Sequence, residues 1–406
     1  MAARKTRRRS PGEGGCWSYK TKAGERWRAR GPVRMADGTV QQAQRKGFLT
    51  KTDGLAWLAE AQSAGRKGEY IAATDERLGS YGRQVIEGLR LSPQTQASYL
   101  KNWRLHIEPY PVAQIRLAQV TGTRLTGHYR ELETSGRRDH REGEGLSART
   151  TRYIATIIHK VLAQAVRDGL VAKNAADAAT PPSAREARPP EMQPWTEPQL
   201  AAFLDWSAAN SGGHALWHTL AYTGARRGEM LALRWRDVDL ESGTVTIRRS
   251  AGLVRTAGVG ASVVEGLTKS GKPRLVSIDS DALAVLKAHK AERGKAALEL
   301  ARPDSLVFGT IENGWRNPEH TSRQFARDIQ RCQTALGSDK VPTCRLHDLR
   351  HAHASILLTA GVPVHVVSKR LGHASPVVTM TVYAHLLPGS DEEAAITFGR
   401  RIRGAA

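Results

Sequence analysis

The sequence is poor in the features that mark secreted, disulfide-bonded and membrane-spanning proteins. It contains three cysteines, Cys16, Cys332 and Cys344, which are too few and too widely spaced for a disulfide framework or a CxxC motif. A chain that acts in a reducing cytoplasm is therefore expected. No apolar run approaches the roughly 18 residues of a membrane-spanning helix, and no signal-peptide core is evident, so neither is predicted.

Acidic residues are the other scarce class. The chain has 39 Asp and Glu residues against 61 Lys and Arg residues, and its formal net charge is +22. Residues 1–70 hold 16 basic and 6 acidic residues, a net charge of +10, so this short region carries nearly half of the excess. Such an excess points to a polyanionic partner. Because no basic amphipathic helix that would favour a membrane surface is evident, we expect the partner to be nucleic acid.

The basic N-terminal region, residues 1–70, is predicted to be a flexible tail followed by a small DNA-binding domain. Short β-like runs at 16–21, 26–33 and 39–48 are separated by turn sequences, and a helical pattern follows at 49–65. A three-stranded sheet with one helix and many basic residues, with Trp27 interleaved among arginines, suits DNA binding. The residues expected to contact DNA are Arg26, Arg28, Arg30 and Lys46. The alternative is a solvated basic sheet without a partner.

Residues 71–180 are predicted to form a compact helical domain. Ser92 precedes a proline at the first position of a helix, which is a common start signal. Ser147 can cap a second helix, whose apolar residues recur with a period of about 3.6 residues. A stripe of that kind is expected to face a core.

The remaining chain is predicted to be a linker, a mixed domain and a tail. Residues 181–195 are rich in proline and are expected to be an extended linker. Residues 196–388 mix helices with short strands, and the strand at 274–278 is expected to end a hairpin turned at 269–272. The tail, residues 389–406, is expected to be disordered or to dock on a neighbouring protomer.

The stretch HDLRHAHAS allows two interpretations. His347 and His351 are four residues apart and share one face of a helix, which is the spacing of a zinc-binding helix. His347 and Arg350 are three apart and also share a face, which suits a phosphate. A zinc protease helix has glutamate where Asp348 stands, no third ligand is evident, and the positive charge opposes a cation. We therefore predict a phosphate site and neither a metal nor another cofactor.

Five stretches of the mixed domain carry a family resemblance when they are taken together. They are TGARRGEML (223–231), LTKSGKPRLVSI (267–278), HDLRHAHAS (347–355), LGHASP (371–376) and TMTVYAHL (379–386). Each is weak alone, but in this order, with Tyr383 ten residues after His373, the chain resembles the tyrosine recombinase or phage integrase family. The resemblance covers the mixed domain throughout and the two upstream domains more weakly.

This resemblance implies a fold and a set of site residues. The fold is multidomain and mainly α with α+β parts: a small three-stranded sheet with a helix, which binds arm-type DNA, a helical core-binding (SAM-like) bundle, and a mixed α/β catalytic domain. The residues that look like the family's catalytic set are Arg226, Lys269, His347, Arg350, His373 and Tyr383, with Glu229 as a supporting acid.

The chemistry of a phosphodiester supports these roles. Arg226 and Arg350 can stabilise the charge that develops on the equatorial oxygens during attack. The phenol of Tyr383 has an ordinary pKa of about 10, so it is protonated at neutral pH and must lose its proton to attack. His347 can take that proton. Lys269 can protonate the leaving 5′-oxygen. His373 would donate a hydrogen bond to a non-bridging oxygen, and Glu229 would hold an arginine.

Several neighbouring residues compete for these assignments. Lys272 is three residues from Lys269, and the long Gly-rich stretch 250–266 before them leaves the register of the lysine turn open. Arg227, next to Arg226, is expected to be a DNA-backbone contact or a surface charge. His351 and His353 lie outside the motif register and are expected to be hydrogen-bonded helix histidines without a catalytic role.

The resemblance predicts a site-specific DNA recombinase, the integrase of a phage or other mobile element in a bacterial host. A 3′-phosphotyrosyl link would conserve the energy of the broken bond, so neither ATP nor a metal is required. Expected partners are double-stranded DNA with core and arm-type attachment sites, three further copies of the chain in a tetramer, and DNA-bending or directionality factors. The alternatives are a type IB topoisomerase-like enzyme and a catalytically inactive DNA-binding regulator.

Overall fold

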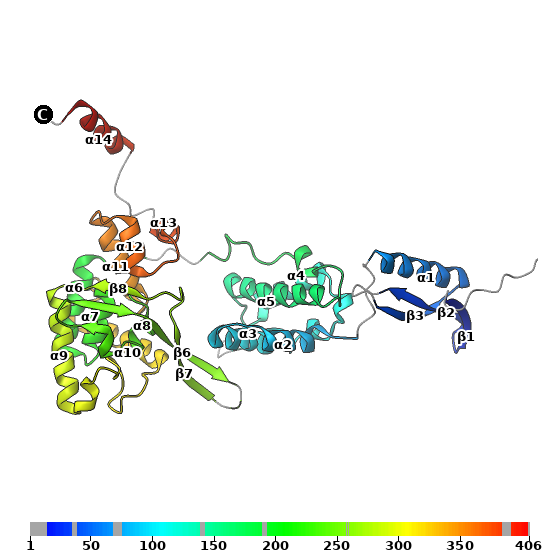
Figure 1. The fold of residues 1–406 in the computed structure, drawn as a ribbon, viewed down its shortest axis with the longest axis horizontal. Helices are drawn as coiled ribbons and strands as arrows, with labels where there is room; N and C mark the ends of the chain where they lie inside the picture. Colours follow the sequence, from blue (N-terminus) through cyan, green and yellow to red (C-terminus); the bar gives the residue numbers. More distant parts are fainter. Residues whose placement is uncertain are drawn as a thin grey trace, which may run out of the picture. The chain divides into compact units, whose positions relative to one another are not determined.

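The computed structural model divides into two units, unit 1 (Met1–Pro190) and unit 2 (Glu191–Ala406) (Figure 1). The residues that it describes are 14–34, 39–67, 75–138, 143–188, 193–256, 258, 260–383 and 391–404. The basic tail predicted at the N-terminus lies almost wholly outside them. In the described part, no helix is long and apolar enough to cross a membrane.

Unit 1 begins with the small sheet predicted from the sequence. Strands β1 (Gly15–Thr21), β2 (Gly24–Arg34) and β3 (Val40–Phe48) are antiparallel, in that order. Helix α1 (Lys51–Arg66) packs on one face of the sheet, and its first turn is capped by the hydroxyl of Thr50 (Figure 1).

Strand β2 turns its apolar residues toward α1 and its basic residues away from it. Ala29 and Val33 are buried, and Leu58 of α1 is buried with Ala29 in one small cluster. Because residues two apart on a strand share a face, Arg28 and Arg30 lie together on the open face of the sheet, and both are exposed.

The neighbouring strands add two residues to this open face. Lys46 of β3 and Trp17 of β1 lie directly opposite Arg28, and Trp17 is 49% exposed. Trp27, although interleaved with the arginines in the sequence, packs on the side of α1, where Nζ of Lys51 lies 5.8 Å from the centre of its ring. The aromatic residue beside the arginines is therefore Trp17.

The rest of unit 1 is a helical bundle, as predicted. Ser92 and Ser147 each cap a helix by accepting a hydrogen bond from the backbone N–H three residues on. The stripe on the longest helix is buried as expected, with Ile158 and Val161 fully enclosed. The elements are α2 (Leu78–Gly88), α3 (Pro93–His106), η1 (Pro111–Gln114), η2 (Leu117–Gln119), α4 (Gly122–Ser135), α5 (Ala148–Arg167) and η3 (Ala175–Ala178).

Unit 2 is a mixed α/β domain. Its elements are α6 (Glu197–Asn210), α7 (His214–Thr223), α8 (Arg227–Leu231), η4 (Trp235–Asp237), β4 (Val238–Asp239), β5 (Thr244–Ile247), β6 (Arg249–Thr256), β7 (Gly260–Leu267), β8 (Arg274–Ser277), α9 (Ser280–Ala296), η5 (Leu298–Ala301), α10 (Pro318–Leu336), α11 (Asp348–Thr359), α12 (Val364–Leu371), α13 (Pro376–Tyr383) and α14 (Asp391–Arg403).

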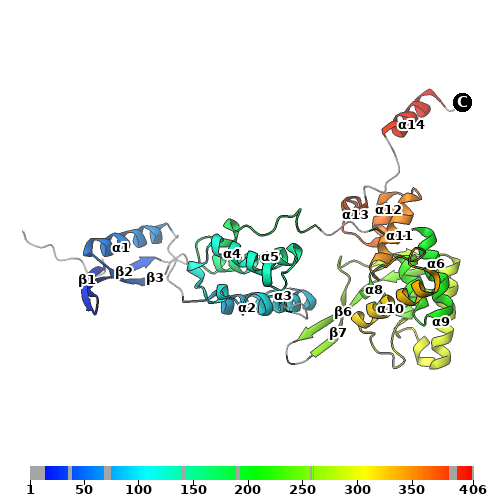
Figure 2. The ribbon, with the colours of Figure 1, turned by 180° about the vertical axis from the view of Figure 1, so that it is seen from behind.

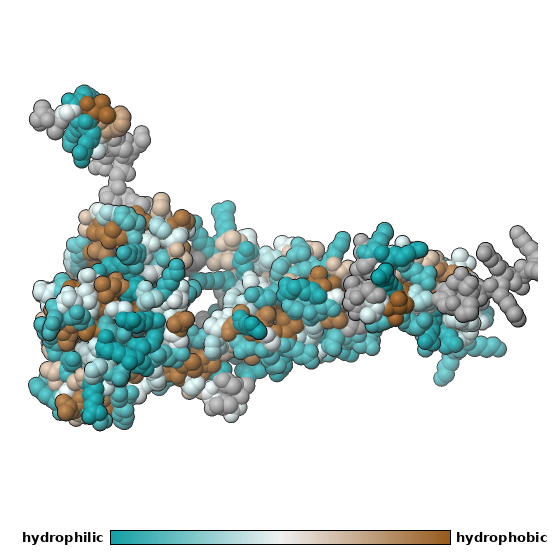
Figure 3. Space-filling view, viewed as in Figure 1, coloured by the Kyte–Doolittle hydropathy of each residue, from teal (hydrophilic) through white to brown (hydrophobic). Residues whose placement is uncertain are grey.

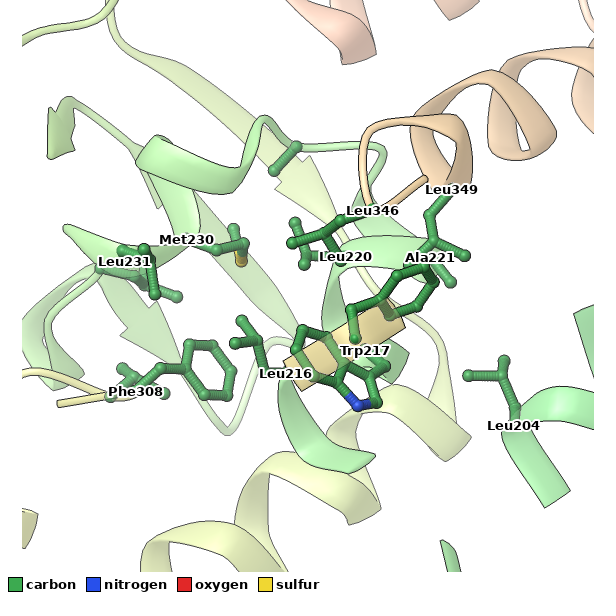
Figure 4. Close-up of a cluster of buried hydrophobic side chains, with 14 of the residues drawn as sticks. Leu204, Leu216, Trp217, Leu220, Ala221, Met230, Leu231, Phe308, Leu346 and Leu349 are labelled. Atoms are coloured by element: carbon green, nitrogen blue, oxygen red, sulfur yellow. The ribbon is translucent and has the colours of Figure 1, made fainter. Parts of the chain in front are cut away.

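The main core of unit 2 surrounds α7. Figure 4 shows Leu216, Trp217 and Leu220 of this helix among side chains from other segments. Trp217 is fully buried, and its Nε1 donates to the carboxylate of Asp328 on α10 at 3.0 Å. Helix α7 also packs against α11, so the same core holds the start of the HDLR helix.

The linker predicted at 181–195 ends inside this core. Trp195 is 3% exposed, and its Nε1 donates to the carbonyl oxygen of Pro342 at 2.9 Å. Its burial contradicts an extended linker at that residue, because a large aromatic side chain contributes more to stability in a core than in solvent.

The predicted hairpin at 269–272 is wrong. Strand β6 pairs with β7 as a hairpin, and β8 pairs with β5 in a different sheet. The turn at 268–273 therefore joins strands of two sheets. The Gly-rich stretch before it is not a loose connection but this hairpin, which extends beyond the rest of unit 2 in Figure 2.

Candidate active site

The sequence motifs lie where elements of unit 2 begin or end. TGAR joins α7 to α8, HDLR begins α11, LGH follows α12, and Tyr383 is the last residue of α13. Gly224 and Gly372 end their helices with φ values of 61° and 69°, in the left-handed region that glycine enters without a steric penalty. His373 directly follows Gly372, and Arg226 follows Gly224 after Ala225.

Arg350 connects these two turns. Its guanidinium donates to the carbonyl oxygens of Gly224 at 2.7 Å and Leu371 at 2.8 Å, and the residue is 4% exposed. Burial, reinforced by the charge of Arg226, lowers the pKa of Arg350 to about 9. The site therefore holds neighbouring cations whose repulsion an incoming anion would relieve.

Glu229 holds two arginines beside Arg350. Its buried carboxylate accepts hydrogen bonds from Arg226 at 2.9 Å and from both terminal nitrogens of Arg274 at 3.1 and 2.6 Å. Arg274, the first residue of β8, also donates to the carbonyl oxygen of Arg370 at 2.9 Å. Burial opposes the charge of Glu229, but Arg274 and then Arg226 outweigh it, so the pKa of Glu229 is lowered.

His373 is held by a hydrogen bond within the same region. Its Nδ1 lies 2.7 Å from the hydroxyl of Thr379, a fully buried residue of α13. Burial, followed by the charges of Arg350 and Arg226, lowers the pKa of His373 to about 4. The ring is therefore neutral at pH 7, and Nε2 is the atom left for a ligand.

Tyr383 packs into a small apolar cluster, and its hydroxyl meets a histidine. The phenol oxygen lies 2.5 Å from Nδ1 of His351, and Tyr383 is 3% exposed. Burial raises the pKa of Tyr383 to about 12, although the charge of Arg350 lowers it. The other buried members of the cluster are Ala354, Leu358, Val367 and Leu371.

His347 and His351 form a row of rings that ends at Tyr383. The rings of His347 and His351 meet edge to face, with centroids 5.3 Å apart and an interplanar angle of 89°. The side chain of His347 reaches solvent on one side, yet partial burial and the charge of Arg350 lower its pKa. Sequence register predicted a hydrogen-bonded helix histidine at 351, and the structure places the partner of that hydrogen bond inside the site, at the hydroxyl of Tyr383.

The two other residues outside the register have partners within unit 2, as predicted for His353, whereas Arg227 is half-buried and not a surface charge. Nε2 of His353 accepts a hydrogen bond from Nε of Arg370 at 3.0 Å, and His353 is 8% exposed. Arg227 donates to the hydroxyl of Ser322 on α10 at 2.6 Å. Each contact joins two elements around the site.

Lys269 lies in the turn between β7 and β8. The backbone N–H of Gly271 donates to the carbonyl oxygen of Thr268 at 2.8 Å, and the hydroxyl of Thr268 donates to the carbonyl oxygen of Lys272 at 3.1 Å. Both lysine side chains are exposed and have no hydrogen bond or ion pair within the described residues. The structure therefore does not bring Lys269 into contact with the arginines and histidines.

Arg274 and His351 are site residues that the motif comparison missed, although each left a signal in the sequence. His351 follows His347 by four residues, so the two share a helix face. Arg274 is two residues from Val276, which is buried on β8, so strand alternation turns both to the same side.

The site offers cations and neutral imidazoles to a ligand. Within the described residues, no group of three or more His, Cys, Asp or Glu side chains is arranged to hold a metal ion. His347 and His351 are adjacent as their spacing predicts, but Nδ1 of His351 is engaged by Tyr383. Two guanidiniums near a buried phenol suit a tetrahedral anion that is attacked by the phenol oxygen.

Comparison with known proteins agrees with this chemistry. Residues 196–389 match the model of the phage integrase family. The ICEBs1 integrase of Bacillus subtilis is 28% identical over 263 residues, which are 64% of this chain and 67% of that protein. A XerC-like tyrosine recombinase of Caldanaerobacter subterraneus is 23% identical over 364 residues, 86% of this chain and 89% of that protein. Residues 196–389 belong to the phage integrase family of tyrosine recombinases.

Solved structures share the fold of this recombinase. The Tn1549 transposon integrase, solved in complex with a circular intermediate DNA, matches 80% of this chain and 99% of that chain, with a TM-score of 0.64 and 16% identity. A lambda integrase, solved as a tetramer bound to a Holliday junction, matches 92% and 96%, with a TM-score of 0.53 and 14% identity. The predicted multidomain, mainly helical architecture with small sheets is confirmed.

The predicted enzyme class is also confirmed: the protein is a tyrosine-type site-specific recombinase. Neither a type IB topoisomerase-like enzyme nor an inactive regulator is favoured by these relatives. Membership in the recombinase family explains why the five motifs occur in this order along the chain.

We expect the Glu229→Gln recombinase to be less stable than the wild type at pH 7, by about 3–5 kcal/mol, because the buried side chain of Arg274 and the partly exposed side chain of Arg226 lose their counter-charge. The pKa of Glu229 is lowered from its ordinary value of 4.5 on folding, so its contribution is complete above that value and is lost as the pH falls through the folded pKa. Urea unfolding of the two proteins at several pH values measures the difference.

The difference between the two proteins should therefore be constant near neutral pH and shrink below about pH 4.5. Glu292→Gln is the matched control, since Glu292 pairs with Lys295 on the surface. This change should lower the free energy of unfolding by less than about 0.5 kcal/mol. Equal stabilities of the Glu229→Gln and Glu292→Gln proteins at pH 7 would contradict the structural role of Glu229.

Proposed function

We propose that this recombinase cuts and rejoins DNA at a core site through a covalent bond between the oxygen of Tyr383 and a 3′-phosphate. The observation that supports this most is the gathering of a buried phenol with Arg226, Arg350 and His373, which come from four separate elements. Tyr383 attacks phosphorus, the 5′-oxygen leaves, and a 5′-hydroxyl of a partner strand later reverses the reaction. The bond energy is kept in the phosphotyrosyl link.

The arginines are the groups proposed to stabilise the transition state. Arg226 and Arg350 would donate to the equatorial oxygens, and Glu229 with Arg274 would fix the orientation of Arg226. Fixed donors of this kind are effective because they need no reorganisation when charge develops, and one such donor is worth about 10²–10³ in rate. The Nε2 atom of His373 would donate to a non-bridging oxygen.

Cleavage needs a proton donor for the leaving oxygen and a proton acceptor for Tyr383. The exposed Lys269 would protonate the leaving 5′-oxygen, and its position in a surface turn leaves its amine accessible to bound DNA. His347, at the solvent-facing end of the histidine row, is the residue to which the motif register assigns the proton of Tyr383.

The sheet of unit 1 is proposed to bind a second, arm-type DNA site. Its open face carries Arg28, Arg30 and Lys46 together, with Trp17 beside them, and Arg26 lies on β2 with the same alternation. A two-stranded or three-stranded ribbon fits the major groove, where side chains can reach base edges. Two DNA-binding modules on one chain raise each other's effective concentration on a composite site.

A second copy of this chain is the proposed partner of helix α14. Ile396, Phe398 and Ile402 are 47%, 69% and 71% exposed on this helix, and Figure 3 shows its apolar and polar residues together at the surface. Burying large apolar side chains is favourable by about 1.5–3 kcal/mol each. Strand exchange uses four active sites, so we propose that four copies form a homotetramer on DNA. This tetramer would integrate and excise a phage or other mobile element in a bacterial cell.

Tyr383→Phe removes only the attacking oxygen, so we expect DNA binding to persist and the covalent adduct to disappear. The measurement is a denaturing gel of protein bound to a nicked core-site substrate, beside a native gel shift. Tyr222→Phe is the control, because Tyr222 is a half-buried phenol of α7 that stacks on His218 and should retain the adduct. A denaturant-resistant adduct with the Tyr383→Phe protein would refute the assignment.

Lys269→Ala should slow cleavage, and a substrate with sulfur in place of the 5′-oxygen should restore much of the rate, since a thiolate leaves without protonation. The measurement is the single-turnover cleavage rate of the Lys269→Ala protein relative to the wild type on each substrate. On the oxygen substrate the rate should fall by about 10²–10⁴-fold. Lys272→Ala, in the same turn, is the control and should cleave both substrates normally. If Lys272→Ala shows the rescue instead, the general acid is Lys272.

Arg28→Ala should weaken binding to the flanking arm site and lower the slope of log affinity against log salt by about 1. Arg66→Ala, which removes an exposed arginine from α1, is the control and should leave both quantities nearly unchanged.

A chain that begins at residue 71 should still cleave core-site DNA but recombine poorly on a full attachment site. Equal recombination by the shortened and intact chains would rule out the arm-binding role.

A further inference from the structure

The hydroxyl of Tyr383 has one histidine as its direct neighbour. Nδ1 of His351 lies 2.5 Å from the phenol oxygen, which is the range of a short O–H···N hydrogen bond. Tyr383 is 3% exposed, so water does not compete freely for this hydroxyl. His351 comes one helical turn after His347, on the side of α11 that faces α13.

His347 is farther from the reacting oxygen. Its ring meets the ring of His351 edge to face, with centroids 5.3 Å apart, and the ring of His351 in turn lies 5.7 Å from that of Tyr383. Among the described residues, no hydrogen bond joins His347 to Tyr383. The order of the row is therefore His347, His351, Tyr383, and a proton that leaves the phenol meets His351 first.

We propose that His351, rather than His347, takes the proton of Tyr383 during strand cleavage and returns it during ligation. This assignment rests on the proposed function of Tyr383 as the nucleophile. His347 then supports the ring of His351, which it contacts.

The step balances as follows. The Tyr383 oxygen forms a bond to phosphorus while its proton passes to Nδ1 of His351, and the bond between phosphorus and the 5′-oxygen breaks. The leaving oxygen takes a proton from the general acid, proposed to be Lys269. In ligation a 5′-hydroxyl attacks phosphorus and returns its proton to the amine of Lys269, while the bond between phosphorus and Tyr383 breaks and the Tyr383 oxygen recovers its proton from His351. No oxidant, metal or further reactant is needed.

The charges around His351 keep it neutral before DNA binds. Burial, followed by His347, lowers the pKa of His351 to about 4, while burial raises that of Tyr383 to about 12. A neutral imidazole beside a protonated phenol is the state from which a base can accept a proton. The titratable or charged groups that face this ring are Arg345, His347, Asp348 and Arg350 at the start of α11, His373 after α12, and Tyr383 on α13.

Bound DNA would change this balance. The negative charge of a phosphate between Arg226 and Arg350 would offset the cations that disfavour a protonated imidazole. At the same time, bond formation to phosphorus makes the phenol proton far more acidic than in free Tyr383. The first effect begins when DNA binds and the second only as the bond to phosphorus forms, so proton transfer to His351 is coupled to attack.

The test is single-turnover cleavage of a nicked core-site DNA by full-length variants. His351→Ala and His351→Gln should each cleave about 10²–10⁴-fold more slowly, with DNA binding unchanged. Glutamine can accept a hydrogen bond but not hold a proton, so it separates orientation from proton transfer. His365→Ala is the control, because His365 is an exposed histidine of the adjacent helix α12.

A more acidic phenol distinguishes a base from a packing residue. When 3,5-difluorotyrosine replaces Tyr383, its ring fluorines lower the phenol pKa, so less base is needed. The fluorinated residue should restore much of the rate lost by His351→Ala and His351→Gln. It should restore little of the rate lost by His347→Ala, and it should flatten the fall in rate toward low pH in the otherwise wild-type enzyme.

Three outcomes would overturn the proposal. These are wild-type cleavage by His351→Ala, wild-type cleavage by His351→Gln, and rescue by the fluorinated residue in His347→Ala but not in the His351 variants. Each leaves Tyr383 as the nucleophile. A covalent adduct formed by Tyr383→Phe would instead refute the proposed function itself, so the two failures are distinguishable.

Discussion

The buried guanidinium of Arg350 is the contact on which the site depends. It donates to the carbonyl oxygens of Gly224 and Leu371, so one side chain on α11 holds together the end of α7 and the end of α12. Both of those helices end in a left-handed glycine, which leaves their last carbonyl groups free to accept. Without this link, Arg226 and His373, which follow the two glycines, would have no common position.

The second constraint is electrostatic. Arg226, Arg274 and Arg350 lie close together, with Glu229 as the buried counter-charge. One carboxylate cannot neutralise three guanidiniums, so an excess of positive charge stays in a site shielded from water. Burial and, after it, the charge of Arg226 lower the pKa of Arg350. The protein thus holds, before DNA binds, the charge arrangement that a phosphate transition state requires, at a cost in stability that Glu229 limits.

Two histidines of the site are neutral although they lie beside the arginines. Next to the cations, His351 and His373 are kept neutral, each with a pKa of about 4, and each ring is oriented through Nδ1 by a hydroxyl. For His373 that hydroxyl belongs to a fully buried threonine, and for His351 it belongs to the phenol of Tyr383. Helix α13 provides both hydroxyl groups, so its packing on α12 sets the position of two histidines as well as the nucleophile.

The sequence by itself determined the features that depend on neighbouring residues. Alternation in β2 separated Ala29 from Arg28, Ser147 marked the start of α5, and motif order identified the family, because each pattern is encoded within a few residues. Tertiary structure decided which strands pair, because nothing in the residues next to β8 specifies that it pairs with β5 and not with β7. It also decided that His351 meets Tyr383 and that Arg274 meets Glu229, because these partners are 32 and 45 residues apart and only the packing of whole elements brings them together.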